Sequence, residues 1–156
     1  MRIAVLLAIA ARLAVPPSPA PAADNDEAAI REMTSEFCGA VARGDLTVLD
    51  RMFDPATSNV FYDINEGPLM GTERLKRVWQ ATTRNSRLQK FEFGPDMKIT
   101  IDGTHALQTG TWTQVQAQQD GTTREITGRA TILWKKSAGT WKAYHYHGSV
   151  TPRRPR

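Results

Sequence analysis

The sequence contains a single cysteine, Cys38, so no disulfide bond can form within the chain. It also lacks a hydrophobic run long enough to cross a membrane. The apolar run at residues 3–11 has nine residues, whereas a membrane-spanning helix needs about 20. Composition is not biased either, since 40% of the 156 residues are hydrophobic and 23% are charged. These absences exclude a disulfide scaffold, a multispan membrane protein and a disordered chain, and they favour one globular domain.

The body of the chain also lacks an excess of charge of one sign. The formal net charge is +4, but five of the 20 basic residues lie at the two ends. Two are in the first 23 residues, and the others are Arg153, Arg154 and Arg156. Without these ends the chain has 15 basic and 16 acidic residues. The basic isoelectric point is therefore no argument for a nucleic-acid partner, and none is predicted.

The first 23 residues have the organisation of an export signal. A short basic start precedes the apolar run, prolines follow it, and Ala-Pro-Ala at residues 20–22 is a small-residue cleavage site. We therefore predict cleavage after Ala22 or Ala23, a periplasmic or secreted location, and no stable membrane insertion of the mature chain. Arg12 lies late for such a signal, so an uncleaved anchor or a wrongly assigned start is the alternative.

The first half of the mature chain has helical periodicity. Apolar side chains at Ile30, Met33, Phe37 and Val41 recur at intervals of three and four residues, and Gly44 is a natural helix end. This predicts a first helix with caps at residues 24–26. Two further helices are predicted after Asp45 and after Thr72, with a short strand over residues 60–63 between them.

From Phe91 onward the pattern changes to strands. Strands are predicted over residues 97–101, 106–118, 125–136 and 141–150. Asp-Gly pairs at residues 102–103 and 120–121 predict hairpin turns, so consecutive strands should pair antiparallel. Helices followed by an antiparallel meander indicate a single α+β domain over residues 24–152, with a basic tail at 153–156.

Three stretches carry a family resemblance when they are taken together. They are residues 42–46, residues 60–71, and residues 134–149, which contain Trp134, Trp141, His145 and His147. In their order and spacing they resemble the nuclear transport factor 2-like superfamily, in particular SnoaL-like domains and the association domain of calcium/calmodulin-dependent protein kinase. The resemblance implies a cone-shaped fold with three N-terminal helices packed in a curved antiparallel sheet. It also implies a deep pocket and assembly as dimers or higher oligomers through the outer sheet face, of which we predict a homodimer.

Asp63 is the first catalytic candidate. The resemblance places it near the general-base aspartate of ketosteroid isomerase, and a carboxyl group facing an apolar cavity has a raised pKa that suits a base. A turn-capping aspartate at the pocket mouth is the alternative. The groups with which that isomerase stabilises its enolate are missing, because their positions fall at Phe37 and at Thr131 or Ile132. Steroid isomerase activity is therefore not expected.

Aromatic residues are expected to line the pocket. The resemblance assigns Trp112, Tyr144 and Tyr146 to its wall, and Phe61, Trp79 and Ile132 are further ligand-binding candidates. Where the kinase association domain has arginines, this chain has Trp112, Ile132 and Gly148, which favours a neutral, largely apolar ligand. Filling of the core is the alternative role for these side chains.

No metal site or cofactor is predicted. His145 and His147 share one strand face, but no Asp, Glu or Cys lies beside them in sequence. The resemblance puts both on the outer sheet face, where subunits pair. The chain has no glycine-rich phosphate loop and no nucleophile elbow. Cys38 is expected to be a small buried apolar residue.

Three functions remain open. The first is an exported protein that binds a small organic molecule, with Asp63 as a polar anchor. The second is an enzyme without a cofactor, an isomerase, dehydratase or cyclase that uses Asp63 as acid or base with Tyr144 or Tyr146 as hydrogen-bond donors. The third is an oligomerisation module whose pocket is incidental. The missing enolate-stabilising groups favour the first over the second.

Overall fold

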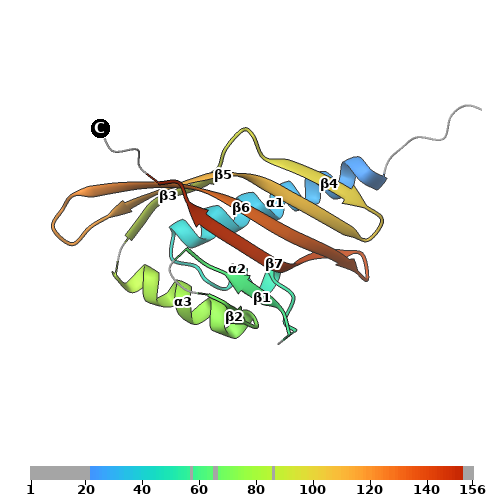
Figure 1. Ribbon diagram of the computed structural model, residues 1–156, viewed down its shortest axis with the longest axis horizontal. Coiled ribbons are helices and arrows are strands. Elements are labelled where there is room, and N and C mark those ends of the chain that lie inside the picture. The colour runs from blue at the N-terminus through green and yellow to red at the C-terminus, as the bar shows by residue number, and fades with distance from the viewer. Residues whose placement is uncertain (1–21, 57, 65–66, 86, 153–156) are drawn as a thin grey trace, which may run out of the picture.

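A computed structural model describes residues 22–56, 58–64, 67–85 and 87–152 (Figure 1). The predicted export signal up to residue 21 and the basic tail lie outside these described residues. In the described part, three helices come first or between short strands, and long strands follow. None of its helices is both long and apolar enough to cross a membrane.

The helices largely follow the predicted periodicity. Helix α1 spans Ala22–Ala42, α2 spans Val48–Met52 and α3 spans Thr72–Asn85. Ile30 and Val41 on the predicted inner face of α1 are fully buried. Helix α1 begins before the acidic residues that were expected to cap it, in keeping with the high helix propensity of alanine. Asp26 instead accepts a hydrogen bond from Lys136, with 2.6 Å between Oδ1 and Nζ.

Seven strands form one sheet in the order β2-β1-β7-β6-β5-β3, and β4 also pairs with β5. The last four strands, β4 to β7, were predicted, whereas β2 and β3 were not. The strands are β1 Val60–Tyr62, β2 Leu69–Met70, β3 Arg87–Phe93, β4 Lys98–Asp102, β5 His105–Ala117, β6 Thr123–Ser137 and β7 Thr140–Val150.

The sheet is mixed, which corrects the expectation of a wholly antiparallel one. Strand β1 pairs parallel with β7, and every other pair is antiparallel. Strand β7, the last of the meander, pairs with β6 on one side and with β1 on the other. After β1 the chain continues through β2 to α3 (Figure 1).

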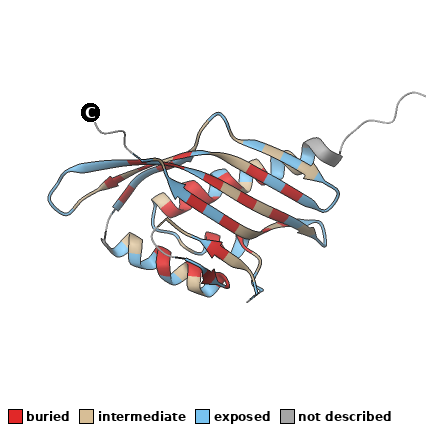
Figure 2. Cartoon of the chain, viewed as in Figure 1, coloured by how far each residue is buried: buried red, intermediate tan, exposed pale blue. Residues whose placement is uncertain are grey.

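The core lies between the helices and the inner face of the sheet. Buried and exposed residues alternate along the long strands, as expected for a sheet with one covered face (Figure 2). The ring of Phe37 on α1 lies 6.1 Å from that of Phe53, 5.7 Å from Trp79 and 5.6 Å from Phe91. Through these edge-to-face contacts, Phe37 on α1 connects the end of α2 and helix α3 with strand β3. The core therefore has an aromatic centre.

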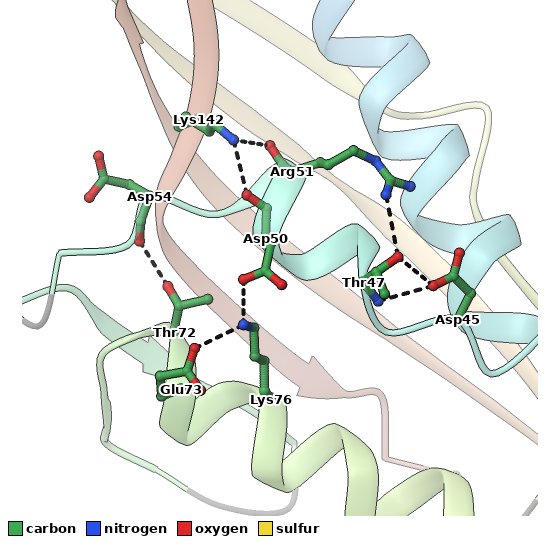
Figure 3. A network of polar contacts seen from close by, with 9 residues as sticks. All are labelled: Asp45, Thr47, Asp50, Arg51, Asp54, Thr72, Glu73, Lys76 and Lys142. Atoms are coloured by element: carbon green, nitrogen blue, oxygen red, sulfur yellow. Dashed lines mark hydrogen bonds and ion pairs between the residues drawn. The ribbon is translucent and has the colours of Figure 1, made fainter.

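A polar network fixes α3 against α2 and β7 (Figure 3). The ammonium group of Lys76 on α3 forms ion pairs with Asp50 on α2 and with Glu73. Lys142 on β7 donates to the backbone carbonyl of Asp50 at 3.0 Å and to that of Arg51. A lysine at the end of a helix satisfies carbonyl groups that have no partner within the helix. The network therefore links α3 to β7 through α2.

Candidate functional site

A cavity of about 470 Å³ is bounded by α3 and the inner face of the sheet. Helix α3 contributes Val78, Trp79, Ala81 and Thr82, and the segment after β1 contributes Asp63 and Ile64. The apolar part of the sheet wall consists of Trp112, Ile126, Tyr146 and Val150. The aromatic core continues into this wall, because the ring of Phe91 lies 5.9 Å from Trp79 and 6.3 Å from Trp112.

Two glycines make room for the aromatic side chains of the wall. Gly128 on β6 pairs directly with Trp112 on β5. A Cβ atom at Gly128 would lie 2.2 Å from Cζ2 of Trp112 and 2.1 Å from the carbonyl oxygen of Ser149. A Cβ atom at Gly148 would lie 2.3 Å from the hydroxyl oxygen of Tyr146. The indole and the phenol therefore lie against bare backbone.

Asp63 and Tyr146 border the same side of the cavity. Strand β1 pairs with β7 so that Phe61 lies beside Tyr146, and Asp63 follows β1 directly. Burial raises the pKa of the Tyr146 hydroxyl, and the negative charge of Asp63 raises it further. The hydroxyl therefore stays protonated at physiological pH. It can donate a hydrogen bond to a molecule in the cavity.

The rest of the sheet wall is polar, which the sequence reasoning missed. Gln114, Gln116 and Gln118 follow Trp112 at every second position of the chain and line the cavity with it. Arg124 on β6 lies directly opposite Gln116 and also lines the cavity. The signal was present in the sequence, because alternation along a strand puts residues i, i+2 and i+4 on one face.

Four of the residues predicted for the site come together around the cavity. Asp63, Trp79, Trp112 and Tyr146 all line it. The structure does not bring the other three to it.

Phe61 and Ile132 are fully buried in the core and are not among the lining residues. The ring of Phe61 packs instead against Phe53, with 5.2 Å between ring centroids. Both side chains are therefore part of the hydrophobic core and do not form the surface of the cavity.

Tyr144 lies outside the cavity, contrary to the expectation that it shares a face with Tyr146. The register of the β6–β7 pair shifts between Leu133 and Trp134, which leaves Tyr144 without a paired residue opposite it. Such a bulge adds one residue to the strand and changes the faces on which its side chains lie. The ring of Tyr144 lies 6.3 Å from that of His105 at an exposed part of the sheet.

The outer histidines contact β1. Nδ1 of His145 lies 2.8 Å from the carbonyl oxygen of Val60, and the ring of Tyr62 lies 6.2 Å from His145 and 5.4 Å from His147. Within the described residues, no three His, Cys, Asp or Glu side chains are grouped to hold a metal ion.

Phe37, Thr131 and Cys38 offer no chemistry to the cavity. Phe37 is part of the aromatic core, and neither it nor Thr131 lines the cavity. Cys38 is buried, and this burial raises the pKa of its thiol to about 12. A thiol with that pKa is a poor nucleophile at neutral pH.

Comparison with known proteins identifies similar folds. A profile of the SnoaL-like domain matches residues 30–153. A nuclear transport factor 2-like superfamily protein from Salmonella enterica serovar Typhimurium has 19% identity and a TM-score of 0.76, covering 86% of this chain and 96% of its own. No functionally curated protein matches the sequence.

Two further solved structures carry functional names. One is a candidate dehydratase of the same family from Streptomyces avermitilis, with 19% identity and a TM-score of 0.70, covering 83% of this chain and 99% of its own. The other is a candidate calcium/calmodulin-dependent protein kinase II association domain from Xanthomonas campestris. It has 16% identity and a TM-score of 0.58, and the match covers 96% of this chain and 100% of the other. At these identities the likeness establishes the fold alone.

Proposed function

This chain belongs to the SnoaL-like domain family, and from that premise we propose that it is an exported protein whose cavity binds a small organic molecule. The cavity carries this proposal. Its volume of about 470 Å³ falls in the range of small-molecule sites, roughly 300–1,000 Å³. The glycines at positions 128 and 148 let the rings of Trp112 and Tyr146, which line the cavity, lie directly against the sheet backbone.

The wall indicates an occupant with both apolar and polar parts. Trp79, Trp112 and Tyr146 offer flat apolar surfaces against which a ring or a branched chain can pack. The three glutamines on β5 add amide groups that can fix its orientation by hydrogen bonds. The proposed ligand is therefore more polar than the apolar molecule that the sequence favoured.

Binding of a neutral fluorescent probe tests the proposal. N-phenylnaphthylamine brightens when it enters an apolar cavity, and it should do so with this protein. Ala81 lines the cavity, so Ala81→Trp should block the probe. Its exposed neighbour on α3, Gln80, does not line the cavity, so Gln80→Trp is the matched control and should leave binding unchanged. Equal binding by both variants would contradict the proposal.

A second candidate function is an enzyme without a cofactor, of the isomerase, dehydratase or cyclase type. The juxtaposition of Asp63 with the protonated hydroxyl of Tyr146 favours it, because it combines an acid–base group with a hydrogen-bond donor. The similar Streptomyces protein, itself described as a candidate dehydratase, is in keeping with this reading.

Asp63→Asn separates the two functions once a ligand is in hand. Native mass spectrometry of protein purified from its exported compartment supplies that ligand as a retained mass. If Asp63 is an anchor, Asp63→Asn weakens binding of the ligand. If Asp63 is a general acid or base, the variant keeps binding and loses turnover.

We further propose that two copies of the chain pair through the outer sheet face near His145 and His147. The third function, an oligomerisation module with an incidental pocket, makes the opposite prediction to ligand binding. In that case substitutions at Trp112 or Tyr146 change only stability, and substitutions at the outer histidines separate the subunits.

A further inference from the structure

We infer that the ligand of this cavity is an organic anion, whose anionic oxygen group lies at Arg124 while its apolar part packs against Trp112. The inference rests on the proposed function, since it requires that the cavity bind a small molecule. It goes further by naming the charge and orientation of that molecule. Three observations carry it.

The first observation is that the cavity wall contains donors without acceptors. The indole nitrogen of Trp112 and the side-chain amide nitrogen of Gln118 are buried and have no hydrogen-bond partner. Trp112 as a whole is only 2% exposed. An indole N–H can only donate, and a buried donor without a partner carries a substantial cost. A ligand whose oxygen atoms come within hydrogen-bond distance of these nitrogens removes that cost.

The second observation is the position of Arg124. It lies directly across the β5–β6 pair from Gln116 and lines the cavity. None of the ion pairs among the described residues involves it. A guanidinium group presents a planar set of donors that matches carboxylate, sulfonate and phosphate oxygens. Arg124 is thus a cation at the cavity whose negative partner is not supplied by the described chain.

The turn that precedes Arg124 is closed by hydrogen bonds, which fix the backbone where β6 begins. The backbone N–H of Gln118 donates to the carbonyl of Thr122 at 2.8 Å. Asp120 accepts hydrogen bonds from the backbone and the hydroxyl of Thr122 at 2.9 and 2.6 Å. Figure 1 shows this β5–β6 hairpin extending past the end of α3.

The third observation is the separation of charges along the cavity. Asp63 lies near Tyr146 at β1 and β7, whereas Arg124 lies at the β5–β6 hairpin. An anionic group is repelled by the first and attracted by the second, so the ligand has one favoured orientation. Gln116 lies four positions after Trp112, about 13 Å along a strand. That span fits a ring system with its anionic group at one end.

A pair of dyes that differ only in charge tests this inference. Anilinonaphthalene sulfonate and N-phenylnaphthylamine share one ring system, and only the first carries a sulfonate. We expect Arg124→Gln to weaken binding of the sulfonate by about tenfold, the worth of one charge-assisted hydrogen bond, and to change the neutral dye less than twofold. Arg129→Gln removes the same charge from the opposite face of β6, where Arg129 is exposed, and should change neither affinity.

The outcomes separate this inference from the proposed function. Suppose that both dyes bind and that Arg124→Gln changes both affinities equally, or changes neither. The cavity then binds small molecules but Arg124 does not select an anion, and the inference is overturned. If Arg129→Gln weakens the sulfonate as much as Arg124→Gln, attraction by the net charge explains the effect and the inference also fails. If neither dye binds, the proposed function itself fails.

Discussion

Gly128 and Gly148 allow two aromatic side chains of the cavity wall to lie against the backbone of the sheet. Both occupy strand positions where a Cβ atom would collide with an aromatic side chain that lines the wall. At Gly128 the collision also involves the carbonyl oxygen of Ser149, which cannot move without disturbing β7. Glycine normally weakens a strand, so its presence at these two places points to a close approach of side chain to backbone.

Gly128→Ala is therefore expected to destabilise the protein by about 2 kcal/mol or more, because overpacking forces the indole and the strand apart. The free energy of urea unfolding measures the change. Thr127→Ala is the matched control on the exposed face of the same strand, with an expected change within about 0.5 kcal/mol. Equal stability of the two variants would show that Trp112 does not lie against Gly128.

Gln108 is the centre of a buried hydrogen-bond group away from the cavity. It is fully buried, and its side-chain oxygen accepts from the indole of Trp134 at 3.0 Å and from the hydroxyl of Thr34 at 3.1 Å. Gln108→Leu keeps the volume but leaves the Trp134 N–H unpaired. We expect a loss of roughly 2 kcal/mol in the free energy of unfolding.

A second variant checks the cause of that loss. Trp134→Phe in the Gln108→Leu background removes the unpaired donor, so it should cost less than Trp134→Phe costs in the wild type. The double-mutant cycle, measured by urea unfolding, reports this coupling. Strict additivity of the two substitutions would contradict the assigned hydrogen bond.

At the scale of single residues, alternation along strands predicted some of the site and missed the rest for identifiable reasons. Trp112 and Tyr146 line the cavity as the resemblance implied, and Asp63 borders it. Tyr144 does not, because the bulge on β7 depends on pairing with β6, which a single strand's pattern cannot reveal. The spacing of the glutamines after Trp112 is enough to predict that they share its face of the sheet.

At the scale of elements, Asp26 and Lys136 tie the start of α1 to β6. Their side chains are only 16% and 30% exposed, and the ammonium of Lys136 also lies 5.8 Å from the ring centroid of Trp141. The hydrogen bond from Lys136 lowers the pKa of Asp26 below its ordinary value of 3.8. The first helix is therefore anchored by a charge pair as well as by its apolar face.

This anchor predicts a contribution to stability that depends on pH. The lowered pKa means that the folded state favours the ionised carboxylate. The contribution is therefore fully present above the unfolded pKa of about 3.8 and is lost as the pH falls through the lower folded value. Between neutral pH and pH 3, the stability difference between wild type and Asp26→Asn should shrink, as measured by urea unfolding at each pH. A difference that grows on acidification would contradict the ion pair.

The order of the elements was readable from the sequence because the hairpin signals are local. The Asp-Gly pairs at residues 102–103 and 120–121 lie at two turns of the meander, where Gly103 and Gly121 have positive φ angles of 57° and 82°. The two-residue strand β2 and the parallel pairing of β1 with β7 depend on contacts between distant parts of the chain. No local pattern encodes them.

At the scale of the whole molecule, the export signal can be tested by the mass of the mature protein. Intact mass measurement of protein from the exported fraction should give a chain that begins at Ala23 or Asp24. Cleavage there leaves Asp26 and its partner Lys136 in the mature protein, so the fold should be preserved. A full-length mass with Met1 retained, in a membrane fraction, would favour an uncleaved anchor instead.

The fold of the molecule is shared with its family, whereas its function depends on the site. The SnoaL-like domain covers nearly all of the described chain, and solved relatives share the architecture at low sequence identity. Such folds host unrelated activities, so the site and not the architecture must carry the functional argument. In this chain the site is a cavity lined in one part by aromatic residues and in another by glutamines and Arg124.

The most direct test of the central claim locates a bound probe in a crystal. A brominated naphthalene soaked into the crystals gives an anomalous signal at the bromine position. The account predicts a peak inside the cavity, between Trp79 on α3 and Trp112 on β5, and no peak there in Ala81→Trp crystals. Peaks confined to the outer surface, with the cavity empty in the wild type, would contradict the proposal that this cavity binds small organic molecules.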